Sequence, residues 1–281
     1  MKTSPLALYK FSAIALLGFF ALAGQAQTLP DRIAKTKIIK VAVNAVYPPL
    51  EFKDPRNGEL TGFDVDFGNA LAKELGVKLE WQESAFEQLI PSLKTGRVDM
   101  LLSGLNDRVE RRATMDFVDY LNSGVQFYTL ASNAGVNQLI DLCGKTIGTS
   151  RVTSFPAQVK DWSDKNCVAA GKAPIAVDGT SDSAMARSQL KQGRYEAAAQ
   201  GSETVPYVLS QEPGVFKILG SPFGGTQQGI AFAKEDPQLR DAILMAFRKL
   251  IASGAYEKLI AKWSLQASAV KQPSMNGDPA P

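Results

Sequence analysis

Apolar and polar residues follow two different periods along this chain. Short apolar or alternating runs predict strands at residues 38–43, 77–81, 98–102, 125–131, 145–148, 175–177, 196–199 and 229–233. Apolar residues at helical spacing predict helices over residues 67–75, 87–94, 155–163, 181–192, 237–253 and 256–263. Strands and helices alternate through two successive stretches of the chain. This α/β pattern predicts parallel-type sheets flanked by helices.

The connections that follow the predicted strands are the first candidates for a ligand site. In open parallel sheets, ligands bind in the crevice beyond the carboxyl ends of the strands. The loops after Val43 and Leu102 lie at such ends. We therefore expect both loops to contribute residues to a binding site.

The first 26 residues have the composition of a secretory signal. Lys2 and Lys10 precede the apolar run 11–23, and the small residues Gly24 and Ala26 follow it. We expect cleavage after Ala26 and export to the periplasm. Residues 23–26 contain no cysteine for lipid attachment, and the apolar run is shorter than the roughly 20 residues of a spanning helix. Removing 26 of the 281 residues leaves an expected soluble protein of 255.

Charge and side-chain chemistry exclude several classes of function. The whole chain has a net charge of +3, and loss of Lys2 and Lys10 leaves +1. This balance offers no electrostatic footprint for nucleic acid or an anionic membrane. The sequence has no histidine, which removes Ser-His-Asp and Cys-His nucleophiles, and its two cysteines leave little for a zinc site. We expect no metal, no cofactor and no nucleic-acid partner.

The two cysteines, Cys143 and Cys167, lie in the exported part of the chain. Thiols are oxidised in that compartment, and an even count favours pairing, so we expect one disulfide. A loop of this size would stabilise the fold by roughly 3 kcal/mol in the chain-entropy model. Two separate buried thiols are the alternative.

Several strings occur in the order and spacing of one known family. The chain resembles the polar amino-acid-binding proteins of ABC transporters, the solute-binding family 3, over nearly all of its mature length. The strings that carry the resemblance are YPPLEF at 47–52, GELTGFDVD at 58–66, LIPSL at 89–93, GRVD at 96–99, SGL at 103–105, DLCGKT at 141–146 and GAYEKL at 254–259. No single string is decisive, but their fixed order makes coincidence improbable.

This resemblance implies a two-lobed periplasmic-binding-protein fold of type II. Two parallel-type sheets flanked by helices would be joined by a hinge of two strands, near residues 126–132 and 229–233. We expect lobe 1 at residues 27–130 and 227–266, lobe 2 at 131–226, and a flexible tail at 267–281 that is rich in Pro, Ser, Gly and Ala.

The resemblance also implies a function. The chain would be the periplasmic solute-binding component of an ABC importer, a monomer that captures an amino acid or a related small carboxylate and docks on a permease. It would not be an enzyme. Two alternatives stay open: a binding protein for a non-amino organic acid, and a cyclohexadienyl-type dehydratase of the same fold. The second needs a carboxylic acid poised in the cleft, for which Glu203 is the nearby candidate.

A carboxylate site follows from the family's motif on the first lobe. There, an arginine at the start of a helix binds the ligand carboxylate with a bidentate fork, and motif register selects Arg111 for that role. Chemistry alone does not distinguish Arg111 from Arg108 and Arg112, or from an exposed arginine. The same loop is expected to contact the ligand through Ser103, Gly104 and Asn106.

Aromatic rings and hydroxyls complete the implied site. Tyr47 and Phe86 match positions whose rings pack on both sides of the ligand, although core packing explains Phe86 equally well. Thr153 and Ser154 match a turn in the second lobe whose hydroxyls contact the carboxylate. Both lobes are therefore expected to contribute to one site.

The counter-charge for a ligand ammonium is missing from this sequence. The family normally has an aspartate where this chain has Gly201, and a second acidic position is Asn44. A buried ammonium without a carboxylate is costly, so either Glu203 reaches into the cleft or the ligand lacks a free α-ammonium. Arg108 and Arg151 stand where the family has uncharged residues, and they favour an acidic ligand unless they point to solvent.

Overall fold

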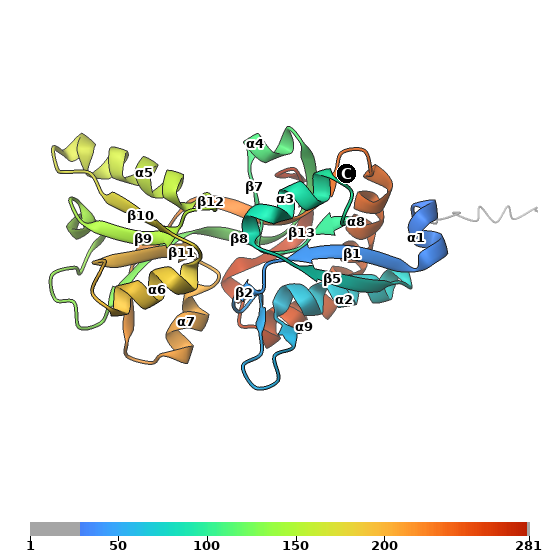
Figure 1. Ribbon diagram of the computed structural model, residues 1–281, viewed down its shortest axis with the longest axis horizontal. Coiled ribbons are helices and arrows are strands. Elements are labelled where there is room, and N and C mark those ends of the chain that lie inside the picture. The colour runs from blue at the N-terminus through green and yellow to red at the C-terminus, as the bar shows by residue number, and fades with distance from the viewer. Residues whose placement is uncertain (1–28, 280–281) are drawn as a thin grey trace, which may run out of the picture.

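The computed structural model describes residues 29–279, and the expected signal at residues 1–26 lies outside them. Two lobes are visible in Figure 1, and two long strands run between them. Each lobe combines sheet strands with covering helices. This is the two-lobed α/β architecture that the sequence predicted.

The first lobe has a short parallel sheet at its centre. Strand β1 pairs in parallel with β5 and β6, so that Val41 lies between Trp81 and Met100. The bounds of the strands are β1 (Ile38–Val43), β5 (Lys78–Glu83) and β6 (Met100–Leu101). The covering helices are α1 (Asp31–Thr36), α2 (Phe63–Leu75), α3 (Phe86–Lys94), α8 (Pro237–Ala252) and α9 (Ala255–Lys262).

The second lobe repeats the strand and helix alternation. Strand β9 pairs in parallel with β10 on one side and β11 on the other. The elements are β9 (Thr146–Ser150), α5 (Phe155–Asn166), β10 (Ala176–Thr180), α6 (Ser183–Lys191), β11 (Ala197–Gly201) and α7 (Val205–Gln211). Helix α6 begins at an N-cap, Asp182, whose side chain accepts a hydrogen bond from the Met185 N–H at 2.7 Å.

The long strands β8 (Met115–Leu130) and β12 (Phe216–Ala233) pair antiparallel and join the two halves of the sheet. The sheet therefore runs β10-β9-β11-β8-β12-β6-β1-β5. The strands expected at residues 125–131 and 229–233 are only the ends of these elements. The remaining length of both strands was not predicted. Strand β8 is buried on both faces, so it lacks the alternation of a half-exposed strand, and the register of β12 shifts between Leu219 and Thr226.

Aromatic packing dominates the core of the first lobe. Phe67 lies at the centre of this cluster, with ring centroids 5.3 Å from Tyr120, 4.9 Å from Phe247 and 5.9 Å from Tyr256. All four side chains are almost fully buried. Their contact fixes helices α2, α8 and α9 against strand β8 and makes the lobe a stable platform.

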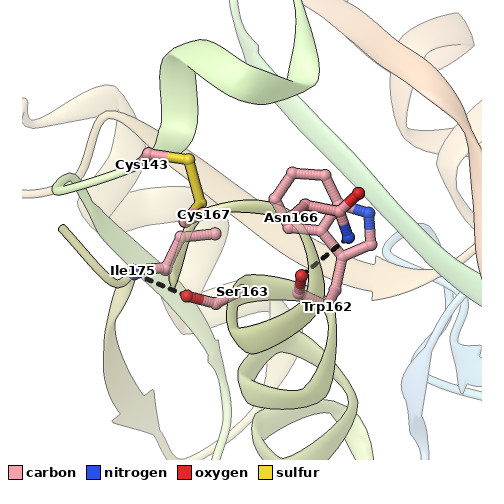
Figure 2. The surroundings of a disulfide bond; sticks show 6 residues. All are labelled: Cys143, Trp162, Ser163, Asn166, Cys167 and Ile175. Atoms are coloured by element: carbon pink, nitrogen blue, oxygen red, sulfur yellow. Dashed lines mark hydrogen bonds between the residues drawn. A yellow bond between two sulfur atoms is a disulfide. The ribbon is translucent and has the colours of Figure 1, made fainter. Parts of the chain in front are cut away.

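The expected disulfide is confirmed, and it ties the end of helix α5 to the segment before strand β9. Cys143 and Cys167 have Cα atoms 5.4 Å apart, within the normal range for a disulfide. Figure 2 shows the bond beside the last turn of the helix, where the Ser163 hydroxyl accepts a hydrogen bond from the Ile175 N–H at 2.8 Å. Both contacts anchor helix α5, whose first turn faces the cleft described below.

We expected a flexible tail at residues 267–281. This expectation is wrong for the described part of the segment, which is ordered. Residues 269–275 form strand β13 (Ala269–Met275), which pairs antiparallel with β8 and then with β14 (Asp278–Pro279). The Asn276 side chain accepts from the Phe117 N–H at 2.8 Å, and Val270 is buried. Composition predicted disorder for this segment. Its backbone instead finds hydrogen-bond partners on strand β8, which the segment alone does not contain.

The remaining elements are short. A small antiparallel sheet stands beside the first lobe, and single turns connect larger elements. Their bounds are β2 (Val46–Tyr47), β3 (Glu51–Lys53), β4 (Leu60–Thr61), β7 (Asn106–Asp107), α4 (Val109–Arg112), η1 (Leu139–Leu142), η2 (Val168–Ala170) and η3 (Gln266–Ser268). Across residues 29–279, no helix has both the length and the apolar character needed to cross a membrane.

Candidate ligand-binding cleft

A cavity with about 520 Å³ of empty space, counting the part open to solvent, lies between the lobes. Residues from both lobes form its wall: Asn44, Val46, Tyr47, Glu51, Phe86, Gly104, Asn106, Arg111, Ser150, Thr153, Ser154, Phe155, Ser181, Asp182 and Ser183. Eight of the ten ligand-binding residues that the sequence predicted are among them. Ser103 and Glu203 are not.

The Arg111 guanidinium is the one cationic side chain on this wall. Its Nη1 donates to the backbone carbonyl oxygen of Asn106 at 2.7 Å, which turns the side chain inward from helix α4. Burial and the neighbouring Arg108 cation lower the pKa of Arg111 to about 10, so the group stays charged at neutral pH. No carboxylate within residues 29–279 forms an ion pair with it. The remaining N–H donors are available to an anion.

The loop between β6 and β7 provides the polar floor of the cleft. The Gly104 N–H donates to the buried Asp64 carboxylate at 3.0 Å, and its φ of 51° is one that glycine adopts easily. A Cβ at this position would lie 3.2 Å from the Tyr47 ring. Ser103 supports the floor from behind, because its hydroxyl donates to Glu51 at 2.9 Å and accepts from the Asn44 N–H at 2.9 Å.

Hydroxyl groups of the second lobe face this floor at the start of helix α5. The Ser154 hydroxyl accepts from the Asn106 side chain at 2.9 Å, which is a direct hydrogen bond between the lobes. The Thr153 hydroxyl donates to the Ser150 carbonyl at 2.8 Å and accepts from the Phe155 N–H at 3.2 Å. The N-terminus of helix α5 adds a partial positive charge to the cavity that Arg111 also lines.

Aromatic rings supply the apolar part of the wall. Tyr47 and Phe86, which the sequence selected, come from the first lobe, and Phe155 comes from the second. Phe155 is almost fully buried at the beginning of helix α5. The sequence placed Phe155 in a predicted helix but did not connect it to the site.

Glu203 lies behind Tyr47 and does not reach the cleft wall. Its Oε1 accepts from the Tyr47 hydroxyl at 3.0 Å and from Gln228 at 2.8 Å, and its Oε2 accepts from Ser123 at 2.6 Å. The Gly201 N–H donates to the same tyrosine hydroxyl at 3.1 Å. Burial raises the pKa of the Glu203 carboxyl and, with the nearby Glu203 charge, raises the pKa of Tyr47.

Glu51 is an acidic residue on the wall that the sequence analysis did not select, although it belongs to the YPPLEF string. Burial and then the neighbouring Asp64 carboxyl raise the pKa of Glu51 well above its usual range, and burial raises the pKa of Asp64 to about 6. Glu51 Oε2 and Asp64 Oδ1 have no hydrogen-bond partner among the described residues. The raised pKa values favour a proton retained on this pair of carboxyls.

Asp182 is the second acidic residue on the wall that was missed. Besides capping helix α6, it accepts a hydrogen bond from the Ser181 hydroxyl at 3.0 Å. Residues 181–183 follow strand β10 directly, at its carboxyl end. The rule that pointed to the loops after Val43 and Leu102 applies equally to this loop and could have found it.

Arg108 and Arg151 point away from the cleft. Arg108 forms an ion pair with the exposed Glu110 at 3.3 Å, and Arg151 is exposed beside Gly179. Neither side chain lines the cavity. Within residues 29–279, no group of three or more acidic or cysteine side chains is arranged to hold a metal ion.

The cleft wall combines an arginine that has no anionic partner with aromatic rings and hydroxyl groups, and these residues come from two lobes joined by a hinge. Such a site defines an α/β binding protein for a small solute. Comparison with known families gives the same result: the chain belongs to the bacterial extracellular solute-binding proteins, family 3, whose sequence model matches residues 39–266. The resemblance that the strings indicated is therefore confirmed.

Among curated proteins, the chain is 30% identical to the L-arginine-binding protein of Pseudomonas aeruginosa over 259 residues, covering 89% of this chain and 95% of that one. It is 28% identical to the arginine-binding protein ArgT of Corynebacterium glutamicum over 251 residues, covering 89% of this chain and 82% of that one. It is 29% identical to the histidine-binding periplasmic protein of Escherichia coli over 234 residues, covering 80% of this chain and 86% of that one.

Solved structures of the same fold include an ancestral arginine-binding protein bound to arginine, with a TM-score of 0.73 and 30% identity over 81% of this chain and 98% of that one. Another is an ancestral amino acid-binding protein, a precursor of cyclohexadienyl dehydratase, with a TM-score of 0.74 and 29% identity over 83% and 98%. These similarities confirm the fold class.

Proposed function

We propose that this chain is the periplasmic solute-binding component of an ABC importer, and that its cleft captures an amino acid or a related small carboxylate. The observation that supports this proposal most strongly is the Arg111 guanidinium, which faces the cavity without a carboxylate partner among residues 29–279. A bidentate ligand carboxylate would supply that partner. The arginine- and histidine-binding relatives favour a ligand of this size class.

Closure of the two lobes would enclose the ligand. Lobe 1 (27–130 and 227–266) and lobe 2 (131–226) would rotate about β8 and β12, which are the two connections between the sheet halves. Tyr47 and Phe86 would pack on the ligand from the first lobe, and Thr153 and Ser154 would approach it from the second. The closed monomer would then dock on the permease. We also propose that the chain is exported after cleavage behind Ala26 and binds its ligand without turnover.

A thermal-shift and calorimetric screen of the purified protein tests this function. A ligand at a hundred times its Kd stabilises the folded state by roughly 2.7 kcal/mol, so amino acids, hydroxy acids and dicarboxylates can be screened for a rise in Tm. We expect Arg111→Ala to abolish that rise. Arg108→Ala is the matched control, because Arg108 precedes the same helix but pairs with an exposed glutamate outside the cavity.

Two outcomes would contradict the proposal. If no small carboxylate raises the Tm or gives a heat of binding, the cleft is not a carboxylate site. If a carboxylate binds but Arg111→Ala and Arg108→Ala weaken binding equally, the guanidinium in the cleft does not hold it. Mass spectrometry of the exported protein tests the cleavage site independently.

A further inference from the structure

Within the function proposed above, we infer the class of the ligand: a hydroxycarboxylate that carries no ammonium group. This inference rests on the charges and free hydrogen-bonding atoms of the cleft wall. Of the fifteen residues on that wall, only Glu51, Arg111 and Asp182 belong to charged types. Arg111 requires an anion, and the two acids decide whether a cationic group of the ligand also finds a counter-charge.

Neither acid on the wall stands as an unpaired charge. Asp182 is the N-cap of helix α6, where it accepts from the Met185 N–H and from the Ser181 hydroxyl, so its charge already faces the positive N-terminus of that helix. Glu51 accepts from the Ser103 hydroxyl with one oxygen, and burial and then the neighbouring Asp64 carboxyl raise its pKa well above the usual range. A protonated Glu51 has no charge to offer a cation, and ionising it would place two carboxylates in contact inside the protein.

The acid nearest to the wall, Glu203, is also occupied. Three donors from Tyr47, Ser123 and Gln228 surround its carboxylate, and the tyrosine stands between it and the cavity. Position 201 offers no alternative. A Cβ there would lie 2.3 Å from the Tyr47 hydroxyl oxygen and 2.0 Å from Glu203 Oε1, so any side chain at 201 would displace this arrangement.

One buried acceptor on the wall does lack a partner. The Asn106 side chain is 6% exposed, and while its Nδ2 donates to Ser154, its Oδ1 has no hydrogen bond within residues 29–279. The backbone carbonyl of Asn106 accepts from the Arg111 guanidinium, and both residues line the same cavity. A neutral acceptor next to the carboxylate site fits a ligand hydroxyl, which donates one hydrogen bond and needs no counter-charge.

The experiment compares acids that differ only in this group. Isothermal titration calorimetry would use the full protein with matched pairs: alanine and lactate, aspartate and malate, histidine and imidazolelactate, and arginine and its 2-hydroxy analogue. For the side chain that binds best, we expect the hydroxy acid to have a Kd at least tenfold lower than the amino acid. Asn106→Asp places a carboxylate at the free acceptor, so it should narrow or reverse that preference while Ser154 keeps a hydrogen-bond partner.

The outcomes separate this inference from the proposed function. If an amino acid binds as tightly as its hydroxy analogue or more tightly, and Arg111→Ala removes binding, the function stands and the inference is overturned. If neither member of any pair binds, both are overturned. If the wild-type protein prefers the hydroxy acid, the inference stands on that comparison even where Asn106→Asp fails to fold.

Discussion

Replacing Tyr47 with phenylalanine would remove a hydroxyl that connects the two lobes while leaving the aromatic ring in the cleft. That hydroxyl donates to Glu203 at 3.0 Å and accepts from the Gly201 N–H at 3.1 Å. A hydrogen bond to a carboxylate contributes about 1.5–3 kcal/mol, and a neutral one about 1 kcal/mol. Because both bonds cross between the lobes, the proposed opening of the cleft would break them.

The expected loss from Tyr47→Phe is about 2.5–4 kcal/mol of stability of the closed form relative to the open form. Since 1.4 kcal/mol is a factor of ten, the ratio of closed to open form should fall roughly sixty- to seven-hundredfold. Where ligand binds the closed form, its apparent Kd rises by up to the same factor. Calorimetry measures this change, and small-angle scattering of the ligand-free protein should show a larger radius of gyration.

Tyr207→Phe is the matched control for this prediction. The Tyr207 ring also contacts the opposite lobe, 5.9 Å from the Phe52 ring, but its hydroxyl makes no hydrogen bond among the described residues. Loss of that hydroxyl should change neither Kd nor scattering. Wild-type affinity and an unchanged scattering profile for Tyr47→Phe would refute the reasoning, because the two hydrogen bonds would then contribute nothing to closure.

Three further predictions concern stability. Cys143→Ser should lower the free energy of unfolding by about 3 kcal/mol, because the disulfide closes a loop between residues 24 positions apart and so lowers the entropy of the unfolded chain. Differential scanning calorimetry should show a lower Tm that a reductant does not change further. Truncation after Ser268 removes β13 with its bonds to β8, and should lower urea stability by about 2–4 kcal/mol without changing the ligand Kd. Burial, and then the Asp107 carboxyl, raise the pKa of Asp119 to about 7. Its folded form therefore retains a proton that the unfolded form releases near pH 4, so stability falls as pH rises from about 4 to 7. Asp119→Asn should flatten that fall in urea titrations at pH 5 and 7.

Local pattern located most of the helices and the short parallel strands. The run at 38–43 became β1 with the same bounds, and the stop expected at Gly76 ends helix α2, where the glycine has a φ of 66°. These features depend on neighbours in sequence, namely β-branched runs, helical spacing and a residue suited to a left-handed turn. Disulfide pairing and the two-lobed class likewise followed from composition and motif order.

The full length of β8 and the order of β13 did not follow from local pattern. Strand β8 contacts other elements on both faces, so the alternation that marks a half-exposed strand is absent. The segment of β13 contains Pro273 and few large apolar residues, and its order comes from backbone pairing with Leu121 and Val118, far away in sequence. Such pairing is visible only after the chain has folded.

The sequence by itself determined the α/β class, the cysteine pair and, through motif register, the arginine that faces the cleft, because each depends on residue type and local order. Only the tertiary structure decided which acids could meet a ligand. Glu203 and Glu51 are equally acidic in sequence, yet one is held behind Tyr47 and the other beside Asp64. Whether a carboxylate is charged and accessible depends on its burial and its partners, and residues distant in sequence supply both.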